Sequence, residues 1–148
     1  MHRITSSHIE MNTLLNLKYT KNHLWLRMAG KQDFYVGVTT EIFKNIGSIR
    51  SIEMLPEGVS NEKDGSAGTL IGVRDTAELS LPFAAKILII NHEVVKSPGF
   101  LYSDPYYYWI CLVSTNDYAR GPSVLSSKDY TTYIKTNGPG CSSQALLR

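Results

Sequence analysis

The chain has 148 residues, enough for one domain with its own hydrophobic core but not for two. Hydrophobic residues make up 43% of the chain and charged residues 19%, which is typical of a globular protein and excludes a disordered or fibrous one. The net charge is only +2 and the Lys and Arg residues are scattered, so we expect no nucleic-acid partner.

Two cysteines, Cys111 and Cys141, are too few for a disulfide framework, and no spacing typical of a metal site is present. Cys111 lies in an apolar run and is expected to be a buried structural thiol. Cys141 lies in a Gly- and Ser-rich stretch that we expect to be exposed. We therefore predict no metal and a reducing compartment.

The longest apolar runs fall well short of the roughly 18–20 residues that span a bilayer, so we expect no membrane partner. Residues 1–16 are polar, with one Glu, and are no candidate for a secretory signal and a weak one for a mitochondrial presequence. We expect this segment to be flexible. The expected location is the cytoplasm, or the mitochondrial matrix if the source is a eukaryote.

The first elements form a predicted hairpin and a short helix. Residues 24–28 and 34–38 are rich in β-branched and aromatic side chains and flank a Gly-containing turn. In residues 39–47 apolar positions recur on one face, a Thr hydroxyl at either of the first two positions can cap the start, and Gly47 suits the exit. Residues 48–55 alternate imperfectly and predict a further strand.

The middle of the chain predicts a second hairpin. Residues 59–68 are polar and rich in Gly, Asp and Asn, and indicate a surface connection. The apolar runs 70–73 and 87–90 then flank a polar tip at residues 74–78, so we expect these two runs to be the arms.

The remaining elements are shorter. Residues 92–98 predict one helical turn ended by Pro98, and Asp104-Pro105 predicts a turn. Residues 108–113 predict the last strong strand, while 129–134 fit either a strand or a helix and 138–148 indicate a flexible tail. Many short strands with few helices predict a mostly β domain, a barrel or a sandwich.

Five stretches carry a recognisable pattern in the correct order. They are Tyr19-Thr20-Lys21-Asn22-His23-Leu24-Trp25, Val36-Gly37-Val38-Thr39, Glu53-Met54-Leu55-Pro56-Glu57-Gly58-Val59, Asn91-His92-Glu93, and Ser97-Pro98-Gly99-Phe100-Leu101-Tyr102-Ser103-Asp104-Pro105-Tyr106. Together with the central hairpin they resemble the H-protein family of the glycine cleavage system. The resemblance implies a barrel-sandwich hybrid like that of lipoyl and biotinyl carriers, mostly β with short helices, for residues 17–114. Residues 115–148 would be a partly flexible C-terminal extension.

The same resemblance places Arg74 at the position of the family's lipoyl-carrying lysine. Lipoate acylates an amine, whereas a guanidinium stays protonated and is a poor nucleophile. Ile71 also stands where the family has an acidic residue, and Asp75 where a small apolar residue is usual. Lys63 and Lys86 lack the matching context, so we expect no lipoyl cofactor.

Two groups of residues are candidates for docking a partner protein. Asp75 and Glu78 give the tip a charged surface, which would bind through salt-dependent contacts. Tyr106, Tyr107 and Tyr108 replace a glycine-containing loop of the family, and strand alternation would expose some of them. Arg74 can equally be a solvated turn residue without a role.

We expect no catalytic residue and hence no enzyme. His23 and His92 have no acidic or cysteine partner at a recognisable spacing, and the Cys111 thiol lies among apolar neighbours.

Two functional hypotheses follow from the resemblance. The first is a non-lipoylated H-protein-like module that binds proteins such as glycine cleavage or lipoate-metabolism enzymes in an interaction or regulatory role. The second is a lipoyl carrier that shuttles an aminomethyl group during glycine decarboxylation.

Overall fold

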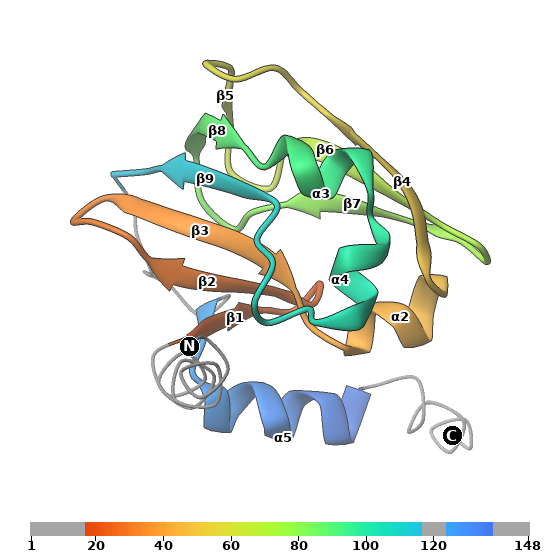
Figure 1. Ribbon diagram of the computed structural model, residues 1–148. Coiled ribbons are helices and arrows are strands. Elements are labelled where there is room, and N and C mark those ends of the chain that lie inside the picture. The colour runs from red at the N-terminus through yellow and green to blue at the C-terminus, as the bar shows by residue number, and fades with distance from the viewer. Residues whose placement is uncertain (1–16, 117–123, 138–148) are drawn as a thin grey trace, which may run out of the picture.

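The computed structural model describes residues 17–116 and 124–137, and these form two antiparallel sheets and four short to medium helices (Figure 1). The larger sheet has the strand order β10 (Val124–Leu125), β1 (Lys18–Thr20), β2 (Leu24–Met28), β3 (Asp33–Val38), β9 (Cys111–Ser114), β8 (Ala85–Ile90) and β5 (Ser60–Asn61). The smaller sheet has the order β4 (Ile49–Met54), β6 (Ser66–Gly72) and β7 (Thr76–Ser80). The helices are α2 (Glu41–Ile46), α3 (His92–Lys96), α4 (Gly99–Ser103) and α5 (Ser127–Asn137).

The main core lies between the two sheets, as alternation along the strands dictates. Along β3, for example, Phe34, Val36 and Val38 are all fully buried in this core, while Tyr35 faces the other side. Helices α2, α3 and α4 lie on the same side of the molecule in Figure 1. They contribute Ile42, Val94 and Leu101 to the main core. The mostly β barrel-sandwich architecture expected from the sequence is therefore confirmed.

A second core lies on the outer face of the larger sheet, where α5 packs against β1 (Figure 1). Its buried members are Leu17, Tyr19, Trp25 and Tyr130. The ring of Trp25 covers Gly37 so closely that an added Cβ would stand 2.2 Å from it, which explains the glycine. The indole N–H of Trp25 also donates to the carbonyl of Pro105 at 2.9 Å and fastens the loop after α4 to the sheet.

Several predicted elements are confirmed. The hairpin of β2 and β3, the helix α2, the strand β4 and the helical turn α3 lie where the sequence indicated them. Gly47 ends α2 with a φ of +81°, which glycine adopts readily. A Thr hydroxyl cap at the start of α2 was wrong, because Thr40 makes no side-chain cap and the Thr39 hydroxyl bonds to Tyr130 instead. For residues 129–134 the helical alternative is correct.

The predicted partner strand of the central hairpin was wrong. The arm that returns from the tip is β7, in which Ala77 and Leu79 turn inward while Thr76 and Glu78 face out. Residues 87–90 belong to β8, which crosses to the larger sheet and pairs with β9 and β5. A short strand with one polar face was therefore mistaken for a long tip.

Three further boundaries differ from the prediction. Within residues 59–68, β5 pairs with β8 and the start of β6 is already extended. Helix α4 follows Pro98, which stands at its N-cap rather than ending all helical structure. The last strong strand, β9, begins only at Cys111, since the preceding tyrosines form a turn. Three predictions concern residues that the structure does not describe. These are the flexibility of residues 1–16, the flexibility of residues 138–148 and the exposure of Cys141.

Within the ranges described, no helix is long and apolar enough to cross a membrane.

Candidate functional site

The turn between β6 and β7 consists of residues 73–75 and places Arg74 at its centre. The strands are in register up to the pair Ile71 and Thr76. Within the turn the N–H of Gly72 donates to the Asp75 carbonyl at 2.9 Å, and the Asp75 carboxylate accepts the N–H of Thr76 at 2.8 Å. Asp75 is thus exposed and shapes the turn with its own side chain.

Arg74 is exposed, and both its backbone and its side chain are hydrogen-bonded to helix α2. Its N–H donates to the carbonyl of Ile46 at 2.9 Å, and its guanidinium donates to the carbonyls of Phe43 at 3.1 Å and Lys44 at 2.9 Å. These carbonyls lie in the last turn of α2, where a cation also interacts favourably with the helix dipole. The side chain at the predicted carrier position therefore serves as a C-terminal cap.

The close approach of the turn to α2 depends on two glycines. A Cβ on Gly72 would stand 2.2 Å from the carbonyl oxygen of Ile46. A Cβ on Gly47 would stand 2.5 Å from Cγ2 of Val73. A side chain at position 72 would require the backbone to shift, and one at position 47 would displace the Val73 side chain and adopt a φ of +81°, which favours glycine.

Glu78 is not part of the charged turn. Its carboxylate lies along the outer face of the smaller sheet and accepts hydrogen bonds from the hydroxyls of Ser66 at 2.5 Å and Thr69 at 3.4 Å. The structure therefore brings Arg74 and Asp75 together and leaves Glu78 two residues into β7.

The tyrosine cluster forms a turn, so its side chains do not follow strand alternation. The N–H groups of Tyr107 and Tyr108 both donate to the Asp104 carbonyl, at 3.1 and 3.2 Å. Tyr106 packs on the second core, where burial raises its pKa. Tyr108 stacks on Phe100 with ring centroids 4.9 Å apart, and only Tyr107, 55% exposed, is presented to solvent.

An exposed aromatic residue that the sequence did not single out packs on Phe43, whose carbonyl binds Arg74. Tyr102 on α4 is 61% exposed, and its ring meets the ring of Phe43 edge-on at 5.0 Å. Phe43 supplies one of the carbonyls to which the Arg74 guanidinium donates. Val73, which precedes Arg74 in the turn, is 54% exposed. We call Phe43, Val73, Arg74 and Tyr102 the tip patch. The signal in the sequence was a large side chain that directly follows the buried helical residue Leu101.

A buried polar network holds α5 in place. The hydroxyl of Tyr130 lies 2.8 Å from Nδ1 of His23 and 2.7 Å from Oγ1 of Thr39, and its ring stacks on Tyr19 at 4.6 Å. Burial lowers the pKa of His23, partly opposed by the nearby carboxylate of Glu41. Burial also raises the pKa of the Tyr19 hydroxyl to about 12 and that of Tyr130 further still, so both stay neutral. His23 is therefore structural.

The other candidate reactive groups are not activated. Cys111 is fully buried and its pKa is raised to about 12, which keeps it a thiol. His92 is exposed, with Nε2 3.5 Å from a carboxylate oxygen of Glu57. Lys86 lies on β8, far along the chain from the tip, and Lys63 lies in the connection between β5 and β6. Among the described residues no group of three His, Cys, Asp or Glu could hold a metal ion.

Comparisons with known proteins agree with this architecture. The family model for the glycine cleavage H-protein matches residues 17–137. A glycine cleavage system H protein of Halothermothrix orenii is 34% identical over 128 residues, covering 84% of this chain and 98% of the relative. Glycine cleavage system H protein 2, mitochondrial, of Arabidopsis thaliana is 27% identical and covers 82% and 78%. The crystal structure of a Mycobacterium marinum H protein superposes with a TM-score of 0.70 at 22% identity, covering 83% of this chain and 97% of that one.

Proposed function

We propose that this chain, which belongs to the glycine cleavage H-protein family, is a protein-docking subunit that carries no lipoyl group at its β6–β7 turn. One observation carries the proposal: the residue at the centre of that turn is Arg74, and its guanidinium is hydrogen-bonded to two carbonyls of α2. A carrier residue must be acylated and must swing between partners. Arg74 lacks the amine and is held in one place.

The tip patch supports docking by the same face. It combines a fixed cation with exposed apolar surface from Val73 and Tyr102, and Asp75 adds a carboxylate beside it. Aromatic and Arg side chains are enriched where proteins bind one another. The expected partners are enzymes of glycine cleavage or of lipoate metabolism, in the cytoplasm or in the mitochondrial matrix. The role is interaction or regulation rather than catalysis.

The second candidate is a lipoyl carrier of the glycine cleavage system, and the comparisons favour it, because the relatives reported above are named as H proteins of that system. In this chain it would need another lysine. Lys63 lies in an exposed turn between β5 and β6, two strands that do not pair with each other, and Lys86 lies on a paired strand, so neither stands at the tip of a hairpin.

Intact mass of the protein purified from lipoate-replete cells separates the two candidates. We expect the unmodified mass. A lipoyl adduct on any lysine, located by peptide mapping, would establish the carrier and end the first proposal.

The variant Arg74→Lys sharpens this test, since it restores an amine at the turn. We expect little lipoylation, because Ile71 still replaces the acidic residue of the family's tip. Arg74→Lys together with Ile71→Glu is the matched variant and is expected to gain more. Full lipoylation of the single variant would show that only the attachment residue separates this chain from a carrier.

Docking is tested separately with purified glycine-decarboxylating enzyme and lipoate ligase from the same organism. Binding of the unaltered chain should weaken at least fivefold in Tyr102→Ser and in Asp75→Lys, and should not change in Lys96→Ala, an exposed site on α3. Equal binding by all four proteins, or by none, contradicts a docking role for the tip patch.

A further inference from the structure

A row of three polar side chains crosses the outer face of the larger sheet. Ser60 of β5 stands opposite Lys86 of β8, and Lys86 stands opposite Ser114 of β9. Residues directly opposite on neighbouring strands point to the same face, so the three side chains lie side by side. The neighbouring Ile87 is buried, which places the row on the face away from the main core.

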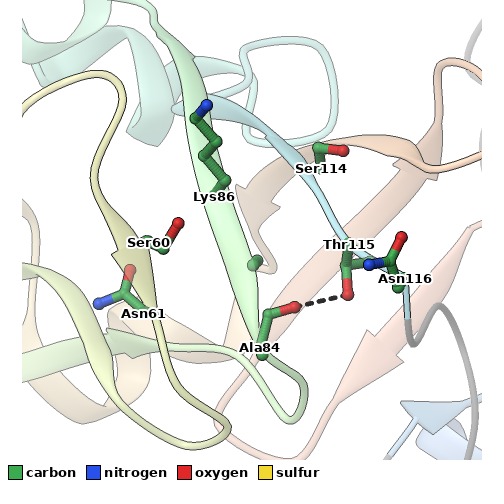
Figure 2. A pocket seen from close by; sticks show the side chains of 8 residues that line it. Ser60, Asn61, Ala84, Lys86, Ser114, Thr115 and Asn116 are labelled. Atoms are coloured by element: carbon green, nitrogen blue, oxygen red, sulfur yellow. Dashed lines mark hydrogen bonds between the residues drawn. The ribbon is translucent and has the colours of Figure 1, made fainter.

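These side chains line a hollow of about 220 Å³, shown in Figure 2. Its walls are Ser60, Asn61, Ala84, Ala85, Lys86, Ser114, Thr115 and Asn116. Ligand pockets for drug-sized molecules start near roughly 300 Å³, and one water occupies about 30 Å³. The hollow therefore suits a small polar molecule rather than a cofactor.

The charge in the hollow is positive and uncompensated. Among its described lining residues Lys86 alone is charged, and no ion pair or hydrogen bond of its ammonium group is found within residues 17–116 and 124–137. Asp33 continues the row beyond Ser114, but its carboxylate turns toward Gly30 and it does not line the hollow. The hydroxyls of Ser60 and Ser114 likewise have no partner in the described part of the chain.

The surrounding groups are oriented by their own hydrogen bonds. Asn116 accepts a hydrogen bond from Gln32 through Oδ1 at 2.9 Å, which leaves its amide nitrogen as a donor, and Figure 2 shows this nitrogen on the Thr115 side. Asn61 donates its amide nitrogen to the Ser66 carbonyl at 2.7 Å, which leaves Oδ1 as an acceptor. Thr115 donates to the Ala84 carbonyl and closes one wall.

We infer that this hollow, the Lys86 site, binds a phosphate group, either as inorganic phosphate or as the monoester of a small molecule. Lys is a common phosphate ligand that acts as a point charge, and hydroxyls and amide nitrogens add neutral donors. The inference stands apart from the proposed function, because it involves neither the β6–β7 turn nor lipoylation.

The test is an NMR titration of the full chain, following the backbone amides of Ser60, Lys86 and Ser114. Sodium phosphate and glycerol 3-phosphate are the probes, with sodium acetate and sodium chloride at matched ionic strength as controls. We expect saturable shifts with millimolar dissociation constants for the phosphates only. The tighter of the two probes identifies the free ion or the monoester as the natural source.

Two variants locate the binding. Lys86→Met should weaken phosphate binding at least fivefold, whereas Lys96→Met, an exposed lysine on α3, should leave it unchanged. Ser114→Asp should have the same effect as Lys86→Met, because it supplies an internal carboxylate beside the ammonium, and it guards against misfolding of the first variant. Linear shifts, equal shifts with chloride, or unchanged binding in both variants would overturn the assignment.

Discussion

The β6–β7 turn and helix α5 are both fastened to the body of the molecule by hydrogen bonds, but in opposite surroundings. Arg74 is exposed and donates to main-chain carbonyls of α2. Tyr130 is 5% exposed and shares its hydroxyl with two other buried side chains, His23 and Thr39. One attachment is surrounded by water and the other is sealed from it.

This difference predicts which attachment can change. An exposed hydrogen bond that breaks is replaced by one to water, so its net contribution is about 0.5–1.5 kcal/mol or less. A buried one that breaks leaves donors and acceptors without a partner, which costs about 1–3 kcal/mol. The tip can therefore acquire new side chains without unfolding the domain, while the junction of α5 cannot.

The largest effect is expected for Tyr130→Ala, which removes both the ring stacked on Tyr19 and the shared hydroxyl. By analogy with other buried aromatic truncations, it should lower the free energy of unfolding by about 3–5 kcal/mol. Chemical denaturation followed by circular dichroism measures this. Tyr130→Phe keeps the ring and should lose about 1–3 kcal/mol, and a loss as small as that of a surface variant would mean that the junction is not sealed.

Gly72→Ala places a methyl group between the β6–β7 turn and helix α2, and it should cause the second largest loss in the free energy of unfolding. The new methyl group would meet the Ile46 carbonyl, so turn and helix must separate, at a cost of about 1–3 kcal/mol. Gly58→Ala is the control for glycine replacement as such, since its φ of +91° brings backbone strain but no atom lies within 4 Å of the new Cβ. A smaller loss at Gly72 than at Gly58 would contradict the close approach.

Acidification should weaken the α5 junction through His23. Burial lowers its pKa below the ordinary value of 6.5 in the folded chain, while Glu41 partly offsets this and the Tyr130 hydroxyl stays neutral. Below 6.5 the unfolded chain therefore binds the proton first, and stability is complete above that pH and falls below it.

The measurement is the urea midpoint at about pH 7.5 and about pH 5.5. His23→Gln should show a smaller loss between the two than the unaltered chain. His92→Gln, at an exposed ring, should retain the full loss. An equal loss in all three proteins would assign the pH dependence to other groups.

The smallest effect is expected for Arg74→Met. It keeps the aliphatic stem of the side chain and removes two exposed hydrogen bonds and a helix-dipole contact, so the loss should stay below about 1 kcal/mol. Thermal melts at low and high salt measure it, and the difference between variant and unaltered chain should shrink as salt rises. A loss of stability as large as that of Gly72→Ala would mean that the Arg74 side chain is required for the conformation of the turn.

The sequence predicts most of the fold because its signals are local. Alternation marks β2 and β3, and the apolar face and final glycine mark α2. The second arm of the central hairpin was mispredicted for two reasons. Thr76 and Glu78 give β7 the polar composition of a loop, and the apolar run 87–90 is compatible with any buried strand. The tyrosines were misplaced because the Asp104 carbonyl, which no residue pattern reveals, organises them into a turn.

The candidate sites likewise divide into those with a local sequence signal and those that depend on tertiary contacts. Arg74 and Asp75 were singled out from the sequence because a family resemblance places them at the tip of its hairpin, and the structure places both in the β6–β7 turn. Tyr102 and the Lys86 site are not, because they arise where α4 meets α2 and where three strands distant in the chain come into register. Such groupings depend on the tertiary fold.

The two outermost strands of the larger sheet, β5 and β10, have a further consequence for behaviour in solution. Each is only two residues long, so the sheet ends on both sides in a very short row of unpaired backbone groups. Long open edges recruit strands from other molecules and begin aggregation, and short ones do not. Pairing with another molecule through the two ends of the larger sheet is therefore disfavoured, and association through a sheet edge would have to use β4 or β7 of the smaller sheet.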